Sequence, residues 1–396
     1  MSEIQVRRVE TPADQRVFFE FPWGHYQDDP HWVPELPSIR RETLDRRKNP
    51  AWEYLTGDYY VAWRDGQPVG TIAAFVNHHH NRVYNENIGF FGFFEAVNDP
   101  AVARALLQTA EQALRGHGVE AIQGPASFTS NEAYGVLVKG FDAPPMVLMP
   151  YNPPYYADLL EGQGFAKVMD LLSWRVDMSN AQRMMYEADG VTESRLVRAI
   201  RRNMERRDLT VRTINMQDKR AEFQRLRDLY NVAWDKNWGF LPMTDRELDA
   251  IVRTLGLLLM PQYTFFGLVR GELAGFLLVI PNLSEVMQVV RPRPGVPEIW
   301  WLLKTAWHFK IRPKVNSVRG ILMGVKEEYR GLGVDAALHL RLAEAMLAEG
   351  RYAWGEAGWV LETNEETNRL TAHFGGVDHR HHRLYRKTLA PPTATD

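Results

Sequence analysis

The chain of 396 residues contains no cysteine. Disulfide bonds, thiolate zinc sites and thiol catalysis are therefore excluded, and a location in the reducing cytoplasm is expected. Long hydrophobic runs are also missing, because the longest apolar region, 265–281, is interrupted by Arg270 and Glu272. No signal-like segment stands at the N-terminus. We therefore expect neither a membrane-spanning helix nor a membrane partner.

An excess of charge of one sign is absent as well. The 47 lysines and arginines nearly balance the 49 aspartates and glutamates, so no overall field attracts nucleic acid, which is not the expected partner. Locally the charge is uneven: residues 193–207 predict an amphipathic helix with Arg195, Arg198, Arg202 and Arg206 on its polar side. A linker helix with a solvated basic face is the expected interpretation, and contact with a polyanion is the alternative.

What the sequence does contain is an internal repeat. Residues 59–77 align without a gap on residues 264–282, and glycines and an asparagine coincide at one constant offset. Each segment predicts a hairpin of two apolar strands joined by a tight glycine turn. In each copy a further strand and a long amphipathic helix follow, at 88–95 and 100–115 in the first copy and at 319–325 and 334–348 in the second. The chain is therefore expected to be a duplicated α/β domain.

The length of the chain fits two domains. One hydrophobic core rarely serves 396 residues, and with 45% hydrophobic residues each half can bury a core of its own. The repeat places the N-terminal copy at 1–190 and the C-terminal copy at 208–390. The basic helix at 191–207 would link them, and 391–396 would form a flexible tail.

The segment 325–336 predicts an anion site. It lies between an apolar strand and an apolar-striped helix, and it contains Arg330, Gly331 and Gly333. The two glycines allow backbone torsions and close approaches that a side chain would block, so several N–H groups can converge on one phosphate at the positive end of the helix. The guanidinium of Arg330 can add a charge-assisted contact.

The motif Arg330-Gly331-Leu332-Gly333-Val334-Asp335, with Glu362-Thr363-Asn364 further on, resembles the GNAT acyltransferase superfamily. In the first copy the resemblance rests on the segments 89–95, 124–132 and 152–165. It covers nearly the whole chain and is closer still to bacterial tandem-GNAT proteins of unassigned substrate. The resemblance implies an α/β fold, with one strongly twisted mixed sheet in each of two tandem domains, splayed open where acyl-CoA enters.

The same resemblance implies an acyl-CoA-dependent N-acyltransferase, which transfers acyl groups other than aminoacyl groups to a small-molecule or peptide amine. Its co-substrate would be acetyl-CoA or another acyl-CoA, its active site would lie in the C-terminal copy, and no metal is expected. The residues that would contact CoA are Val325, Lys326, Arg330, Gly331, Leu332, Gly333, Val334, Asp335 and Asn364.

Two positions depart from the superfamily's pattern. Asp335 would place a carboxylate in the same helical turn as the pyrophosphate. Thr371 stands where many members carry a tyrosine that protonates the leaving thiolate. We expect Glu362 to act as the base, with a structural carboxylate as the alternative. Tyr385 or His373 could replace the missing acid, with a packing or surface role for each as the alternative.

The N-terminal copy departs more. Asp99 followed by Pro100 predicts a helix start whose aspartate caps the amides that a phosphate would need, so this copy is not expected to hold CoA. Its polar and tyrosine-rich segments could instead line an acceptor pocket between the copies, together with a tryptophan pair of the C-terminal copy, with ordinary packing as the alternative. The residues concerned are Asn131, Glu132, Tyr155, Trp234 and Trp238.

Three further interpretations stay open. Histidines cluster at 78–80, which we expect to be a solvated loop, and at 379–382, where a third ligand for a metal is missing. A Fem-type transferase that takes aminoacyl-tRNA would use the basic helix to contact RNA. A non-catalytic binding protein would keep the fold without the chemistry. The acceptor, the acyl length and the oligomeric state do not follow from the sequence.

Overall fold

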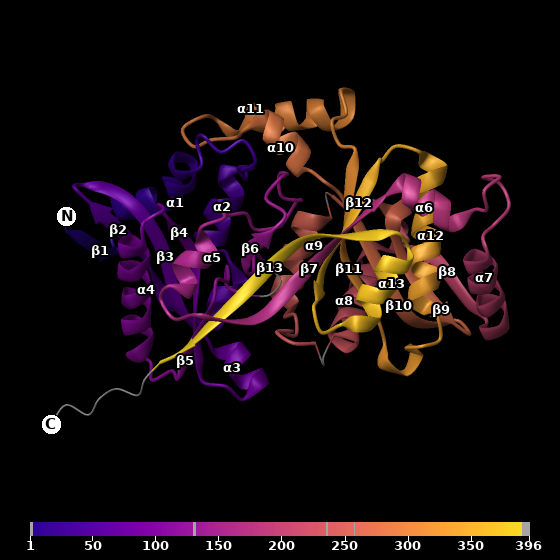
Figure 1. Ribbon diagram of the computed structural model, residues 1–396, viewed down its shortest axis with the longest axis horizontal. Coiled ribbons are helices and arrows are strands. Elements are labelled where there is room, and N and C mark those ends of the chain that lie inside the picture. The colour runs from indigo at the N-terminus through magenta and orange to yellow at the C-terminus, as the bar shows by residue number, and fades with distance from the viewer. Residues whose placement is uncertain (1–2, 130–131, 235–236, 257, 390–396) are drawn as a thin grey trace. The chain divides into compact units, whose positions relative to one another are not determined.

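The computed structural model describes residues 3–129, 132–234, 237–256 and 258–389 (Figure 1). The chain forms two compact units. Unit 1 comprises Met1–Asp170, Ser284–Trp307 and Arg380–Asp396, and unit 2 comprises Leu171–Leu283 and His308–His379. The units therefore group the chain differently from the linear division expected from the sequence, because two segments of the second half belong to unit 1.

Unit 1 is built on a mixed sheet in the order β1-β2-β3-β4-β5-β13, with β6 paired to β13. Only β4 and β5 run parallel in this part of the described chain; the other pairs are antiparallel. The strands are β1 (Ile4–Arg8), β2 (Leu55–Arg64), β3 (Gln67–Asn77), β4 (Ile88–Ala96), β5 (Ala121–Gly124), β6 (Val136–Lys139) and the later part of β13 (Gly376–Thr388).

Helices α1 and α4 pack on this sheet. The longest, α4, packs against β3 and β1 with Val102, Leu106 and Leu107 fully buried. The histidines at 78–80, which we expected in a solvated loop, begin a short helix that Asn77 caps through the amide of His80, so that expectation was wrong. The helices are α1 (Pro12–His25), α2 (Pro37–Leu44), α3 (His78–Tyr84), α4 (Pro100–Arg115), α5 (Tyr156–Glu161), α10 (Ser284–Val290) and α11 (Glu298–Ala306).

Unit 2 repeats the plan, in the order β7-β12-β11-β10-β9-β8. Again one pair, β11 with β12, is parallel, and the other pairs among the described strands are antiparallel. The strands are the later part of β7 (Ala166–Asp177), β8 (Leu209–Thr213), β9 (Thr264–Val269), β10 (Glu272–Pro281), β11 (Ser317–Val325) and β12 (Trp354–Leu361).

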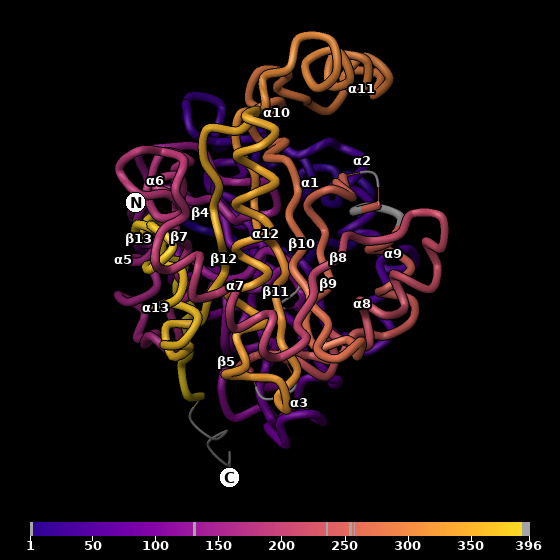
Figure 2. Tube along the Cα trace, turned by 90° about the vertical axis from the view of Figure 1, so that its right-hand side faces the viewer, coloured from indigo at the N-terminus to yellow at the C-terminus, as the bar shows by residue number. Residues whose placement is uncertain are grey.

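Helices lie on both faces of the unit 2 sheet (Figure 2). A Cβ atom added at Gly324 would meet the end of α8, whereas one added at Gly275 would meet Val334 of α12. Gly324 pairs in register with Phe276, the neighbour of Gly275. Successive strand residues point to opposite faces, so α8 and α12 cover opposite faces. The helices are α6 (Met178–Met185), α7 (Arg195–Arg207), α8 (Lys219–Ala233), α9 (Asp245–Leu255), α12 (Val334–Glu349) and α13 (Glu365–His373).

The predicted duplication is confirmed by these elements. Each copy has a hairpin, a third strand, a long helix and a parallel fourth strand; the third strands and long helices lie within two residues of the expected bounds, and the first hairpin begins four residues earlier than expected. The pairing of the last strand of each copy was not foreseen: residues 385–388 pair with β5 in the unit 1 sheet, and residues 171–177 pair with β12 in the unit 2 sheet. A fragment of residues 208–390 would therefore lack a strand of its own sheet. Among the described residues, no helix has the length and apolar character needed to cross a bilayer.

Candidate active site

In unit 2, the strands β11 and β12 separate about half-way along β11. They pair from Ser317 with Trp354 to Gly320 with Ala357, and β11 then continues to Val325 beside β10 alone among the described strands. An irregularity in the β10 pairing skips Ile321 at this point, and such a bulge bends and twists a strand. Beyond Gly320 the edge of β11 has no neighbouring strand on this side among the described residues, as the splayed sheet expected from the sequence requires, and the carbonyls of Met323 and Val325 there accept from Trp234 and Arg330.

The loop after β11 presents a set of free backbone donors at the start of α12. Gly331 and Gly333 have positive φ of 69° and 86°. The N–H groups of Gly331, Gly333, Val334 and Asp335 donate to no acceptor among the described residues. Such a group of amides at a helix N-terminus suits a phosphate. The backbone geometry is therefore that of the anion site expected from the sequence.

Arg330 supports this loop in a way that differs from the expected one. Its guanidinium donates to the carbonyl of Ala233 at 2.8 Å and to that of Val325 at 3.4 Å. Arg330 thus fastens the loop to the end of α8. The amide of Lys326 donates to the carbonyl of Ala274, and its ammonium lies 5.9 Å from the ring centroid of Tyr329.

The basic helix α7 also supports the loop. Asn203 donates to the carbonyl of Leu332 at 2.7 Å, and Arg206 and Arg207 both donate to the side-chain oxygen of Asn203. The apolar side of α7 packs on α12 through buried side chains such as Ile200. The helix expected to be a linker is therefore part of the wall around the loop, and it brings two guanidinium groups close to it.

Asp335 lies in the first turn of α12, as expected. Its Oδ1 accepts a hydrogen bond from the N–H of Ala336 at 2.8 Å. The carboxylate therefore both occupies one donor and adds negative charge beside the four free N–H groups. A second anion bound there would be repelled.

Asp335→Ala is therefore expected to tighten acyl-CoA binding by about 1 kcal/mol, or about fivefold, the usual worth of one charge at a helix N-terminus. Isothermal titration with CoA measures the change, and Glu349→Ala, at the other end of α12, is the matched control. Weaker binding by Asp335→Ala would show that the aspartate organises the loop instead.

A buried cluster lies where β11 and β12 part. Arg319 and Glu356 face each other in the last paired stretch, and both side chains are buried. Nδ1 of His379 lies 2.6 Å from Oε2 of Glu356. Burial lowers the pKa of Arg319 to about 10, although Glu356 opposes the shift, so Arg319 keeps its charge at neutral pH. When Nδ1–H donates to the carboxylate, Nε2 of the neutral imidazole can accept a proton.

Sequence reasoning missed this pair. His379 was considered only as a metal ligand, and Glu356 was not considered. The available signal was a single carboxylate in the otherwise apolar strand 354–361, since a buried charge in a strand needs a partner.

The expected catalytic residues are placed differently. Tyr385, predicted to serve the C-terminal copy, belongs to the core of unit 1, where it is fully buried and donates to Glu161 at 2.9 Å, so a part in the unit 2 site is not supported. Glu362 is half-buried just after β12. Thr371 is buried and donates to the carbonyl of Thr367, and exposed His373 is within 2.7 Å of the carbonyl of Arg369.

Asn364, expected to contact CoA, caps α13 by accepting from the amide of Thr367 at 3.2 Å. The indole of Trp234, expected at the acceptor, donates to the carbonyl of Met323 at 2.9 Å and packs on Tyr230. Trp238 lies half-buried in a turn after α8 has ended, so the two tryptophans do not share a helix.

The candidate acceptor residues of the first copy lie in unit 1. The hydroxyl of Tyr155 donates to the carbonyl of Ala96 at 2.9 Å. Glu132 is half-buried, and its amide donates to the carbonyl of Thr129. Asn131 lies outside the described residues.

The helix cap expected in the first copy is confirmed. Asp99 accepts from the amide of Ala101 at 2.8 Å, and Pro100 opens α4. The amide and the carbonyl of Ala96, at the end of β4, are bonded to the hydroxyls of Tyr156 and Tyr155. The donors that a pyrophosphate would use in this copy are therefore already engaged.

Beside this cap lies a carboxyl group with an unusual environment. Oε2 of Glu95 accepts from the hydroxyls of Tyr26 at 2.5 Å and Tyr156 at 2.7 Å. Burial raises the pKa of Glu95 to about 7, against the opposing effect of the two tyrosines. Nε2 of His25 lies 3.0 Å from the hydroxyl oxygen of Tyr156, and burial lowers the pKa of His25 to about 4. The cluster joins a carboxyl group that titrates near neutral pH to a histidine that is neutral there.

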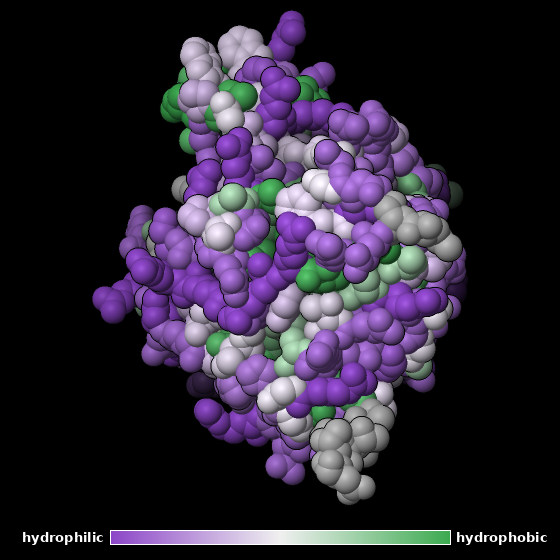
Figure 3. All heavy atoms as spheres, turned by 90° about the vertical axis from the view of Figure 1, so that its left-hand side faces the viewer, coloured by the Kyte–Doolittle hydropathy of each residue, from purple (hydrophilic) through white to green (hydrophobic). Residues whose placement is uncertain are grey.

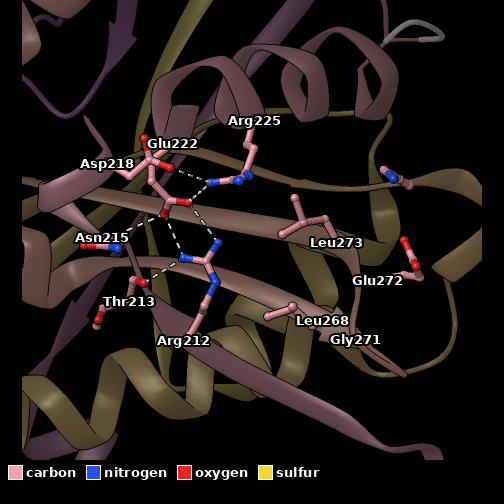
Figure 4. A pocket seen from close by; sticks show the side chains of 11 residues that line it. Arg212, Thr213, Asn215, Asp218, Glu222, Arg225, Leu268, Gly271, Glu272 and Leu273 are labelled. Carbon is pink, nitrogen blue, oxygen red and sulfur yellow. Dashed lines mark hydrogen bonds and ion pairs between the residues drawn. The ribbon is translucent and has the colours of Figure 1, made fainter. Parts of the chain in front are cut away.

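A hollow of about 700 Å³ opens beside the loop, between the start of α8 and the β9–β10 hairpin (Figure 4). Three of its charged side chains face one another: Glu222 accepts from Arg212 at 2.7 Å and 3.0 Å and also from Arg225. Burial alone would raise the pKa of Glu222, but Arg212, the amide of Asn215 and Arg225 outweigh it and lower the pKa to about 2. Arg212 and Arg225 are thus bonded to Glu222, which joins α8 to β8, and Lys326 is the further cation among the residues that line the hollow.

Comparison with known proteins finds relatives of this chain. No family model matches the chain. It is 32% identical to Protein YghO of Escherichia coli K12, over 97% of this chain and 95% of the relative. It is 30% identical to the bacterial ceramide synthase of Caulobacter vibrioides, over 98% of both.

Among solved structures, a tandem GNAT protein from the clavulanic acid biosynthesis pathway matches with a TM-score of 0.56 at 13% identity, over 99% of this chain and 100% of that one. A glucosamine N-acetyltransferase region of a fungal β-N-acetylglucosaminidase matches with a TM-score of 0.54 at 15% identity, over 98% of this chain and 38% of that one. At such identities the similarity shows the fold alone.

The chain is a tandem protein of the GNAT acyltransferase fold. Within that class it belongs to the family that contains the bacterial ceramide synthase of Caulobacter vibrioides and Protein YghO.

Proposed function

We propose that this protein is an acyl-CoA-dependent N-acyltransferase whose active site lies in unit 2. The observation that carries the proposal is the set of four free N–H groups from Gly331 to Asp335 at the start of α12, directly after a strand edge that has parted from its neighbour. The first feature suits a pyrophosphate, and the second suits an extended chain with amide groups, as in pantetheine. Acyl-CoA combines both.

The chemistry needs placement and one proton acceptor. A neutral amine attacks the thioester carbonyl, a C–N bond forms, the C–S bond breaks, and the amine loses a proton as the thiolate leaves. His379 is the base in this proposal, because its Nε2 can accept that proton while Glu356 holds Nδ1. Glu356 acts as a positioning residue, and the thiolate takes its proton from solvent or from the protonated histidine.

The relatives bear on the acceptor. A ceramide is the amide of a fatty acid with a long-chain amino alcohol, and the relative named for its synthesis is 30% identical over 98% of both chains. We therefore propose an amine with a long aliphatic part as the acceptor, and a fatty acyl group as the more suitable donor than acetyl. Transfer of an acetyl group to a small polar amine is the second candidate.

The test is release of free CoA thiol from acyl-CoAs of two to sixteen carbons, offered with a long-chain amino alcohol or with a small polar amine. We expect release that requires both substrates, and mass spectrometry should detect the N-acyl product. Product formed from aminoacyl-tRNA without CoA would support the Fem-type alternative. Absence of both CoA binding and thiol release would contradict the proposal.

A further inference from the structure

The helix α11 exposes its apolar side chains. Trp300 is 60% exposed, Ile299 and Leu303 are each 56% exposed, and Trp307, directly after the helix, is 48% exposed. Soluble proteins seldom leave such large apolar side chains together at the surface, and a contiguous apolar patch usually marks an interaction site.

The exposed side chains share one face of the helix. Ile299, Leu302, Leu303 and Ala306 follow the i, i+3, i+4, i+7 spacing, and the two exposed tryptophans extend the same face to an arc of roughly 160°. Trp301, on the opposite side, is buried. The apolar stripe that would normally face a core therefore faces outward.

The segment before α11 is fastened to unit 1. Trp23 donates to the carbonyl of Pro292 at 2.8 Å, Gln288 donates to that of Pro30, and Arg291 donates to that of Asp29. These bonds hold the base of the α10–α11 segment in place. The exposed face is thus presented by an anchored segment with its own buried tryptophan.

Charge complementarity indicates what covers this face. The whole chain has a net charge of −2, but residues 284–316, counted from the start of α10, contain six lysines and arginines and two acidic residues, Glu285 and Glu298, of which Glu298 accepts from Ser38. The basic residues lie on both sides of the apolar face in sequence and also within the helix: Arg291, Arg293, Lys304, Lys310, Arg312 and Lys314. In the space-filling view, hydrophobic atoms gather at the upper end of the molecule, beside hydrophilic ones (Figure 3).

We propose that α11 lies on the surface of an anionic lipid bilayer, with Ile299, Leu303 and the exposed tryptophans in the boundary between headgroups and acyl chains. Tryptophan suits that boundary, because its ring is apolar and its N–H can stay hydrated. Flanking lysines and arginines suit anionic headgroups. A second protein would have to match these positive charges as well as the apolar face.

The proposal changes one expectation from the sequence. Absence of a membrane partner was expected because no segment spans a bilayer, but a helix that lies in the interface needs no span. The inference rests on α11 and its flanks and does not depend on acyl transfer.

Co-sedimentation with vesicles tests it. The full-length chain should bind vesicles of phosphatidylcholine and phosphatidylglycerol in equal parts, and bind phosphatidylcholine alone more weakly. Trp300→Glu with Leu303→Glu should weaken binding by about a hundredfold or more, because two anchors are replaced by charges that the headgroups repel. Val191→Glu with Val377→Glu is the matched control, since both valines are exposed and lie outside the segment. The control should bind as the wild type does.

Two results would overturn the proposal. One is an absence of vesicle binding by the wild-type chain. The other is a self-associating wild type that becomes monomeric in the α11 double variant, with equal vesicle binding by both, because a second copy would then cover the face. Circular dichroism of the variants excludes unfolding as the cause of lost binding, and a blue shift of tryptophan fluorescence with vesicles, absent in the double variant, gives an independent reading.

Discussion

Gly333→Val is expected to abolish acyl-CoA binding, with an affinity at least about a hundredfold weaker than that of the wild type, or about 2.7 kcal/mol. Gly333 has φ of 86°, and a Cβ atom there would lie 2.6 Å from the side-chain nitrogen of Asn203. A β-branched residue strains that backbone and displaces Asn203 from the carbonyl of Leu332. The N–H groups would no longer converge on one anion. Isothermal titration with acetyl-CoA and CoA measures the loss.

Gly350→Val is the matched control for this variant. Gly350 ends the same helix with φ of 63°, and a Cβ atom there meets only a carbonyl at 4.0 Å. The backbone strain is similar, but it acts at the far end of a 16-residue helix, about 24 Å from the loop. We expect a comparable loss of thermal stability with unchanged CoA affinity. Unchanged CoA affinity in Gly333→Val itself would show that this loop does not bind CoA.

His379→Gln is expected to lower kcat by about a hundredfold or more, the usual contribution of a general base, and to leave the affinity for CoA unchanged. Glu356→Gln should also lower kcat, because the amide no longer fixes the imidazole with Nε2 free to accept a proton. Steady-state kinetics with saturating acyl-CoA measures both variants.

His373→Gln serves as the comparison, since His373 is an exposed histidine of the same unit. It should retain wild-type kcat. If His379→Gln lowered the melting temperature and left kcat unchanged, the pair would serve the fold, and Glu362 would again be the candidate base.

The parts of the fold with strong local signals could be predicted from the sequence. Pro100 with Asp99 before it sets the start of α4, and glycines set the two hairpins and the loop before α12. The bounds of α4 agree with the expected 100–115, and those of α12 differ by one residue at its end. Each of these signals lies within a few residues of its effect.

The rest depends on pairings that no local pattern encodes. The partner of residues 385–388 is β5, more than 250 residues earlier, and nothing in the strand's own alternation selects it. The contact of Asn203 with the loop spans 129 residues. Periodicity predicted apolar faces correctly but cannot tell whether such a face is covered, so α11 was not recognised as exposed. The buried Glu356 was the one missed residue with a readable signal.

Hydrogen–deuterium exchange with and without acyl-CoA tests the central claim most directly. The account predicts that peptides covering 329–338 become protected on binding, because the free N–H groups at the start of α12 receive the pyrophosphate. The corresponding peptides at 96–104 of the first copy should not change, since Asp99 and the tyrosines already engage those groups. Protection at 96–104, with none at 329–338, would contradict the account.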